Sequence, residues 1–232
     1  MRDKKHKFDV AVIGGGPAGL LAAGKAAESG AEVILIEKNL KPGRKLVLTG
    51  KGRCNITNAE FNLRKLVENY GKNGKFLFHA FFVFGPKEVI DFFEKSGLKT
   101  KIERGNRVFP LSDRAEDALK TLVDYSRKNK VSILCGSKVI AISCQNHKIE
   151  KITVKTNKRK EEIEAKNYVF CTGGKSYSST GSTGDGFNWA KSLGHHIEKL
   201  SPALVPIRVK ESWIKDLHGL SLKNVEISVK TG

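Results

Sequence analysis

The segment from Phe8 to Lys38 constrains the fold of this chain more than any other. Its apolar run Asp9–Ile13 stops at three glycines, which is typical of a buried parallel strand that ends in a tight turn. Gly14, Gly16 and Gly19 have the spacing GxGxxG. In such a turn the first glycine permits the sharp bend, the second lets a pyrophosphate approach the backbone, and the third lets the next helix lie against the strand. We therefore expect a strand, a phosphate-binding turn and a helix in direct succession.

The next residues complete a strand–helix–strand unit. Leu20–Ser29 is rich in Ala and Leu, which predicts a helix that Gly30 ends, and its N-terminal amides and positive dipole end would face a phosphate. A second strand, Glu32–Ile36, leads to Glu37, 18 positions after Gly19, where a carboxylate can accept the hydroxyls of an adenosine ribose. A glycine-rich turn without a ligand is the alternative, but the complete order of elements favours dinucleotide binding.

The composition is that of an ordinary folded protein. The chain has 232 residues, of which 39% are hydrophobic, enough for one sizeable core or for one domain and part of another. No apolar run approaches the roughly 20 residues that cross a bilayer, and the charged start MRDKKHK leads directly into the first strand. We therefore expect a cytoplasmic protein without a membrane partner. Neither CxxC spacing nor a close redox pair occurs among the cysteines, which predicts free thiols at Cys54, Cys135, Cys144 and Cys171.

The net charge of +18 raises the question of nucleic-acid binding. The lysines are scattered through every segment, and the one dense basic cluster lies between two predicted strands and is followed by two glutamates. That cluster comprises Lys155, Lys158, Arg159 and Lys160. A solvated hairpin tip explains it, because a high charge affects solubility and nonspecific association more than it defines a site. We therefore expect no specific nucleic-acid partner.

The middle of the chain is predicted to be mainly helical. Residues 61–97 should form two helical pieces, the second of which opens after Pro86. A hairpin is expected around Gly105-Asn106, and Asp113 is expected to cap a helix that runs to about Lys128. An aromatic cluster in the helical region is expected to be core: Phe76, Phe78, Phe81, Phe82 and Phe84.

From Val131 the pattern changes to strands of alternating apolar and polar residues, and the last of them runs into Thr172 and two glycines. The predicted strands lie in residues 131–136, 138–144, 148–156 and 161–174. The connection back to the first sheet is therefore partly a β-meander, where a plain NAD-binding Rossmann domain normally has a helix. This pattern predicts the FAD-binding variant of the fold and disfavours an NAD(P)-only dehydrogenase.

Residues 38–58 are predicted to form a loop, because proline and glycine alternate there with basic residues. Lys45, Lys51 and Arg53 can meet phosphate or an anionic flavin ring. A basic surface loop whose glycines only make turns is the alternative. Cys54 is expected to be a small buried residue rather than a thiol beside the cofactor.

The segment GSTGDG at residues 181–186 places Asp185 between two glycines at the start of a helix over Phe187–Leu193. As an N-cap, Asp185 would satisfy free amides, and its glycine neighbours would let the helix end approach a ligand. A capped surface helix with a glycine-rich lead is the alternative. His195 and His196 follow without a third ligand at metal spacing, so no metal site is expected.

Four motifs stand in order along the chain. They are GGGPAG at residues 14–19 with Glu37 and Lys38, TGKGRCNITN at 49–58, CTGGKSY at 171–177, and GSTGDG at 181–186 followed by PALVPI. In this combination they resemble the BaiN/YhiN-type flavoproteins over essentially the whole chain. The first motif alone would also suit fumarate-reductase-type flavoproteins. The resemblance implies a glutathione-reductase-like FAD-binding fold with an inserted β-rich substrate domain, and activities that include bile-acid-type steroid reduction and amine oxidation.

The resemblance also implies roles for residues in these motifs. The glycine turn would hold the pyrophosphate, Glu37 would hold the adenosine ribose, and Arg53 with its two successors would lie by the flavin. Thr172 and Gly173 would pack at the sheet end near the cofactor, and Val139 would contact adenine through its backbone. The expected FAD-binding residues are Gly14, Gly16, Pro17, Ala18, Gly19, Glu37, Lys38, Lys45, Gly52, Arg53, Cys54, Asn55, Val139, Thr172, Gly173, Gly174 and Asp185.

The sequence thus predicts an α/β protein with a Rossmann-like FAD-binding domain of three layers, β/β/α, whose parallel sheet has a β-meander crossover. We assign residues 1–200 to the N-terminal part of this discontinuous domain, and residues 201–232 to the truncated start of an inserted β-rich substrate domain. The expected function is an FAD-dependent oxidoreductase that transfers a hydride between the flavin and a small organic substrate, with NAD(P)H left open as the electron donor. A noncatalytic flavin-binding module is the alternative, because no catalytic acid or base is identifiable. Val225–Val229 is predicted to be a strand without a partner, so we expect the chain to be the front part of a longer protein.

Overall fold

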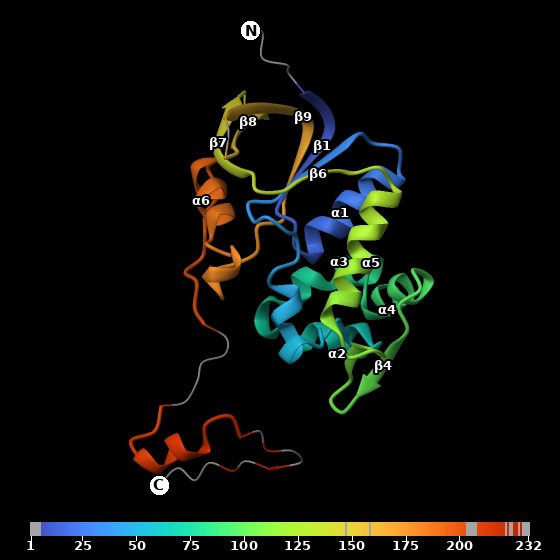
Figure 1. The fold of residues 1–232 in the computed structure, drawn as a ribbon, viewed down its shortest axis with the longest axis vertical. Helices are drawn as coiled ribbons and strands as arrows, with labels where there is room; N and C mark the ends of the chain where they lie inside the picture. Colours follow the sequence, from blue (N-terminus) through green and yellow to red (C-terminus); the bar gives the residue numbers. More distant parts are fainter. Residues whose placement is uncertain are drawn as a thin grey trace. The chain divides into compact units, whose positions relative to one another are not determined.

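The computed structural model describes residues 6–146, 148–157, 159–202, 208–220, 222, 225–226 and 228. The chain divides into two units, Met1–Ile197 and Glu198–Gly232. Both sheets of the described residues belong to the first unit, which also carries the glycine turn (Figure 1).

A six-stranded sheet forms the centre of the first unit, with the strand order β6-β2-β1-β9-β8-β7. Strand β1 pairs in parallel with β2 and β9, and β2 pairs in parallel with β6. Strand β8 pairs antiparallel with β7 and β9, so these three strands form the predicted meander. The strands are β1 (His6–Ile13), β2 (Val33–Ile36), β6 (Ser132–Leu134), β7 (Lys138–Gln145), β8 (Lys148–Lys155) and β9 (Lys160–Phe170). The predicted parallel sheet with a β-meander crossover is confirmed.

The parallel strands are buried on both faces, because successive side chains alternate between two cores. Val12 of β1 and Leu35 of β2 join the core beneath the helices. Ala11 and Ile36, on the same strands, point the other way and pack with Ile152 and other residues of the meander. Figure 1 shows the result, with helices on one side of the parallel strands and the meander curled over the other. These are the three predicted layers.

Helix α1 (Pro17–Glu28) packs against helix α5 (Ala115–Lys128) on the helical side of the sheet. Gly24 permits this close contact, since a Cβ there would lie 2.4 Å from the ring of Tyr125. Ser126 is fully buried in the same contact, and its hydroxyl donates to a main-chain carbonyl of α1 at 2.9 Å. A larger residue at Gly24 would therefore push the two helices apart.

A helical region and a small antiparallel sheet lie between β2 and α5 in the chain. The small sheet has the order β3-β5-β4 and contains the predicted hairpin around Gly105-Asn106, together with a third strand that was not predicted. The elements are β3 (Thr57–Asn58), α2 (Leu63–Glu68), the 3₁₀ helix η2 (Gly71–Leu77), α3 (Phe78–Val83), α4 (Pro86–Lys95), β4 (Thr100–Glu103) and β5 (Arg107–Pro110). The predicted helical character of residues 61–97, with a piece that opens at Pro86, is confirmed.

The aromatic cluster of this region does not form the expected core. Phe76 is 88% exposed and Phe82 is 71% exposed, and no residue of α3 is buried. The expectation was wrong because residues 71–83 form two short helical elements rather than one long helix with a continuous buried face.

Asp113 is not the N-cap of α5, contrary to the expectation from sequence. The N-cap is Arg114, and Asp113 has φ 56°, whereas an N-cap residue typically has an extended backbone. Its carboxylate pairs instead with Arg53 and Lys101. The side chain that was predicted to cap the helix is therefore held by two cations from other segments.

The second unit is described only in part. Among its described residues the structure shows one helical element, the 3₁₀ helix η4 (Ser212–Leu217). Of the strand predicted over Val225–Val229, residues 227 and 229 lie outside the described residues, and the described residues 225, 226 and 228 are not part of a strand. Across the described part of the whole chain, no helix has the length and apolar character that a membrane span requires.

Candidate dinucleotide site

The glycine turn has the close contacts that a pyrophosphate-binding turn requires. Gly14 has φ 109°, and a Cβ there would lie 2.3 Å from the carbonyl oxygen of Cys171 at the end of β9. A Cβ at Gly19 would lie 1.8 Å from the carbonyl oxygen of Gly14, so glycine lets α1 start close to the strand. At Gly16, by contrast, no atom lies within 4 Å of the Cβ position. Gly16 therefore leaves open space where the second glycine of such a turn faces a pyrophosphate.

Helix α1 presents its N-terminus to this space. It begins at Pro17, three positions before the predicted start, because proline at the first helical position has a suitable φ and needs no amide partner. Its N-cap, Gly16, offers no side-chain hydrogen bond, and the first turn contains no acidic residue. The first amides and the positive end of the dipole are therefore available to an anion.

The carboxylate of Glu37 is held against the same turn. Glu37 is 7% exposed, and its Oε2 accepts a hydrogen bond from the main-chain N of Gly15 at 2.7 Å. Its Oε1 accepts two more, from the main-chain N and from Nδ2 of Asn39, each at 2.7 Å. A carboxylate has about four acceptor positions, so these three bonds leave one, on Oε2, for a ligand.

A cavity of about 450 Å³ lies beside the turn and Glu37. Its size is within the range of small-molecule sites, roughly 300–1,000 Å³. It brings together residues after β1, β2 and β9 with the start of β7. Of the residues expected to bind the cofactor, the following line it: Gly14, Gly16, Pro17, Ala18, Glu37, Lys38, Lys45, Val139, Thr172, Gly173 and Asp185.

The other expected residues do not line this cavity. They are Gly19, Gly52, Arg53, Cys54, Asn55 and Gly174. Gly19 acts through the packing of α1 on the glycine turn. The role of the remaining five beside the flavin stays a prediction.

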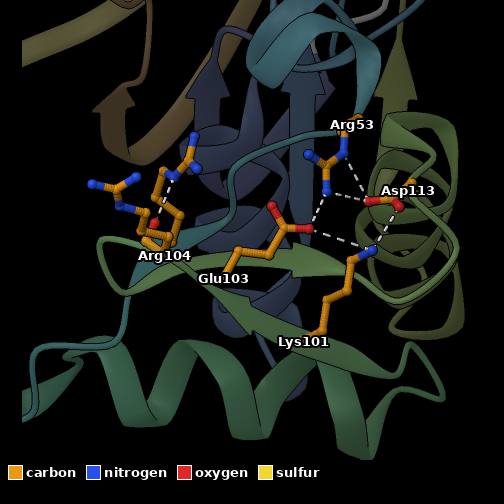
Figure 2. A network of polar contacts seen from close by, with 6 residues as sticks. Arg53, Lys101, Glu103, Arg104 and Asp113 are labelled. Carbon is orange, nitrogen blue, oxygen red and sulfur yellow. Dashed lines mark hydrogen bonds and ion pairs between the residues drawn. The ribbon is translucent and has the colours of Figure 1, made fainter. Parts of the chain in front are cut away.

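Arg53 lies in a network of ion pairs (Figure 2). Its Nε donates to Oδ1 of Asp113 at 2.8 Å, and its guanidinium also pairs with Glu103. The guanidinium carbon lies 4.2 Å from the centroid of the Phe109 ring. Lys101 completes the network, with its Nζ 2.6 Å from Oδ2 of Asp113. Two cations and two carboxylates thus balance here, and donors that were expected to meet phosphate are directed at carboxylates.

The loop that carries Arg53 has an unusual backbone. The predicted loop contains the 3₁₀ helix η1 (Leu46–Gly52), which is interrupted at Lys51 with φ 59°, and Cys54 follows with φ 61°. Such left-handed conformations are uncommon outside glycine and often occur at functional sites. Cys54 is 4% exposed, and this burial raises the pKa of its thiol, with a hydrogen bond from Thr49 acting the other way. Cys54 is therefore the small buried residue that was predicted.

A segment that we call the strap, Ser176–Asp185, borders the cavity. It contains the 3₁₀ helix η3 (Ser178–Thr180) and leads into helix α6 (Asp185–Ser192). The N-cap of α6 is Gly184, so the expectation that Asp185 caps this helix was wrong. The Asp185 carboxylate accepts a hydrogen bond from Nζ of Lys38 at 2.8 Å instead. Burial acts to raise the pKa of Asp185, but hydrogen bonds from Lys38 and Thr183 hold it below its usual value.

Several residues that line the cavity were not predicted from the sequence. They include Asn39, Arg44, Ser137, Lys138, Phe170, Cys171, Thr180, Ser182 and Trp189. Asn39 follows Glu37 by two positions at the end of β2, so its proximity could have been inferred. Trp189 of α6 contacts Phe170 of β9, with ring centroids 5.9 Å apart, and this pairing of distant segments required the fold.

A family model described as the HI0933-like protein Rossmann domain matches residues 8–229. This chain belongs to the HI0933-like family. The match includes the glycine turn, the Arg53 loop and the strap, and the family predicted from the four motifs is confirmed.

Several relatives match most of this chain, among them two with different names. A 3-dehydro-bile acid delta(4,6)-reductase of Clostridium scindens is 34% identical over 204 residues, which cover 87% of this chain and 48% of that protein. A ribosomal RNA dihydrouridine synthase of Escherichia coli is 27% identical over 216 residues, which cover 93% of this chain and 52% of that protein. The chain therefore spans about half the length of these relatives.

Solved structures of low sequence identity share the fold. A flavocytochrome c3 fumarate reductase superposes with a TM-score of 0.66 at 20% identity, over 83% of this chain and 41% of that chain. The apo form of the Mycobacterium smegmatis Sdh1 complex has a TM-score of 0.65 at 21% identity, over 82% of this chain and 39% of that chain. These likenesses confirm the predicted fold class.

Proposed function

We propose that this chain supplies the FAD-binding part of a flavin-dependent oxidoreductase. The observation that carries the proposal is the open position at Gly16, which adjoins the N-terminus of α1 and a cavity bordered by Glu37. Two relatives are named as a reductase and a dihydrouridine synthase, which supports redox chemistry.

The lining residues suit the ADP half of FAD. The glycine turn and the first amides of α1 would hold the pyrophosphate, and Oε2 of Glu37 would accept a ribose hydroxyl. Val139, which is 4% exposed at the start of β7, would flank the adenine. Bound FAD supplies the hydride acceptor and donor, while the protein binds it, orients it and excludes water.

We propose a small organic molecule as the substrate and NAD(P)H as the electron donor. The support for the substrate class is the relative named as a bile acid reductase, which is 34% identical, against 27% for the relative named as a ribosomal RNA dihydrouridine synthase. The electron donor is proposed from the redox chemistry alone.

RNA is the second candidate substrate, and one surface favours it. Residues 69–87 contain no aspartate or glutamate but three lysines and six aromatic residues. Among them Tyr70 is 52% exposed, Phe76 88% and Phe82 71%. Exposed rings beside lysines can stack on bases while the lysines neutralise phosphates. Lys87 pairs with Asp91 at 2.6 Å, so Lys72 and Lys75 are the lysines of this stretch that we expect to meet phosphates. In the predicted basic cluster, Arg159 likewise pairs with Glu161 at 2.6 Å.

Titration of the purified protein with FAD, followed by flavin fluorescence, tests the main proposal. We expect saturable binding, and reduction of the bound flavin by NADH or NADPH without oxygen. Binding without reduction by any donor would favour the noncatalytic flavin-binding module. Absence of FAD binding would reject the proposed function.

Salt-dependent binding of a single-stranded RNA separates the two substrate classes. If RNA is the substrate, the double variant Phe76→Ala/Phe82→Ala should weaken binding about tenfold or more, since stacking contributes about 1–3 kcal/mol per base. The control is Phe61→Ala, because Phe61 is 58% exposed but lies outside the acid-free stretch. Equal weakening by the control would reject this surface as an RNA site.

A further inference from the structure

Asn39 links two sides of the candidate dinucleotide cavity. On one side its main-chain N and Nδ2 both donate to Oε1 of Glu37 at 2.7 Å. On the other side Nδ2 donates to the carbonyl oxygen of Thr180, in the strap, at 3.1 Å. The carbonyl oxygen of Asn39 accepts from the main-chain N of Gly136 at 2.8 Å, which fixes the residue to the connection between β6 and β7. One short side chain thus contacts both the carboxylate and the strap.

The strap needs such contacts because its backbone is strained at Tyr177, which has φ 53°. A left-handed conformation of a non-glycine residue persists where the surroundings hold it. Gly181 has φ 106°, which glycine adopts without strain. A Cβ at Gly181 would lie 2.8 Å from Nδ2 of Asn39, so glycine lets the strap come this close. Thr180 and Ser182 are 6% and 8% exposed, which shows that the middle of the strap is packed against the protein.

Two lysines hold the ends of the same strap. Nζ of Lys45 donates to the carbonyl oxygen of Ser176 at 2.7 Å. Nζ of Lys38 donates to Oγ1 of Thr183 at 2.7 Å and to Oδ2 of Asp185 at 2.8 Å. The side chains of Lys38 and Asp185 are 27% and 25% exposed, so solvent screens this ion pair in part. The bond from Asn39 holds the middle of the strap, between these two ends.

We propose that Asn39 is a positioning residue for nucleotide binding, which fixes the Glu37 carboxylate and ties the strap beside the cavity. The proposal rests on the proposed function, because it takes the ADP half of FAD as the ligand. It also limits what Glu37 can do. Since the protein uses three of its roughly four acceptor positions, Glu37 can bond one ribose hydroxyl and not two.

ADP binding, measured by the fluorescence of Trp189, tests the role of Asn39. Trp189 lines the cavity, and Trp213→Phe in every variant removes the other tryptophan signal. Asn39→Asp keeps the shape but removes the amide donor and places a second carboxylate beside Glu37. We expect the Kd for ADP to rise about tenfold or more. The control is Asn129→Ala, which removes a comparable bond from Nδ2 to a carbonyl of α5 and should leave the Kd unchanged.

Hydrogen exchange without any ligand tests the strap independently. Asn39→Ala should raise the exchange of the amides of residues 177–183 about fivefold or more, while the amides of α5 stay unchanged. Unchanged exchange in residues 177–183 would overturn the role in the strap, even if the wild type bound no nucleotide. Absence of ADP and FAD binding by the wild type would instead overturn the proposed function.

The two deoxy analogues of ADP test the single free acceptor of Glu37. With the wild type, either 2′-deoxy-ADP or 3′-deoxy-ADP should bind about tenfold more weakly than ADP, and the other should bind as ADP does. Similar losses for both analogues would show that Glu37 bonds both hydroxyls, and would overturn this part of the proposal. No loss for either would show that Glu37 bonds neither, with the same consequence.

Discussion

Replacing Glu37 by glutamine tests how the glycine turn and the ligand site depend on one carboxylate. Glutamine keeps the shape and one oxygen, which the two donors of Asn39 would hold at the Oε1 position. Its amide nitrogen must then face the main-chain N of Gly15, which loses the acceptor that it has at 2.7 Å in the wild type. The Glu37 side chain is buried, at 7% exposure, so water does not readily replace this acceptor. A charge-assisted bond of about 1.5–3 kcal/mol is lost. We expect the free energy of unfolding to fall by about 2–3 kcal/mol and the Kd for FAD to rise roughly tenfold to hundredfold.

Urea unfolding measures the first quantity and a flavin fluorescence titration measures the second. The matched control is Glu32→Gln, because Glu32 is exposed and precedes the same strand. Both quantities should match the wild type in this control. If Glu37→Gln also matched the wild type in both, the Glu37 carboxylate would contribute neither to the stability of the turn nor to FAD binding. Lost stability with unchanged affinity would restrict Glu37 to bracing the turn at Gly15.

Three further predictions concern other parts of the chain. Gly16→Val should abolish FAD binding but leave the unfolding temperature normal, because its side chain would enter open space that the pyrophosphate needs; retained flavin in this variant would contradict the prediction. Gly19→Val should lower the unfolding temperature, because its Cβ would clash with the carbonyl oxygen of Gly14. Cys54→Ser should leave the flavin reducible by the same donor, since burial raises the pKa of this thiol and disfavours the reactive thiolate. If the absorbance spectrum showed that the flavin of this variant stays oxidised, a thiol relay would be indicated. Lys101 and then Arg53 hold the pKa of Asp113 below its usual value, so the stability that it contributes is present above about pH 4 and is lost as the pH falls through the lowered pKa. Urea unfolding at decreasing pH should therefore show a smaller acid loss for Asp113→Asn than for the wild type, and equal losses would reject the network as its cause.

The sequence predicted those parts of the fold that depend on local pattern. The three glycines, the Ala-rich helix and the apolar strands determine the first strand–helix–strand unit, because each requires specific residues at fixed spacing. The meander was predicted from the alternation of apolar and polar residues over residues 138–170. Its place over the sheet was predicted from the FAD-binding variant of the Rossmann fold. The exposed Phe76 could not be predicted, since the pattern of residues 71–83 does not show that the helix is broken into short pieces.

The site was predictable where one segment supplies it. The positions of Gly16 and Glu37 beside the cavity follow from strand ends that meet at one edge of a parallel sheet. The two predicted helix caps were wrong because Asp113 and Asp185 each form an ion pair with a lysine from another segment. The sequence alone does not show that Lys38 reaches the strap.

A crystal structure of the protein with FAD would show directly whether the glycine turn and Glu37 hold the ADP half. It should show the ADP half of FAD in the cavity, with the pyrophosphate at Gly16 and one ribose hydroxyl within about 3 Å of Oε2 of Glu37. An FAD molecule bound elsewhere, or an ADP half that leaves Gly16 and Glu37 without contacts, would contradict the proposed function.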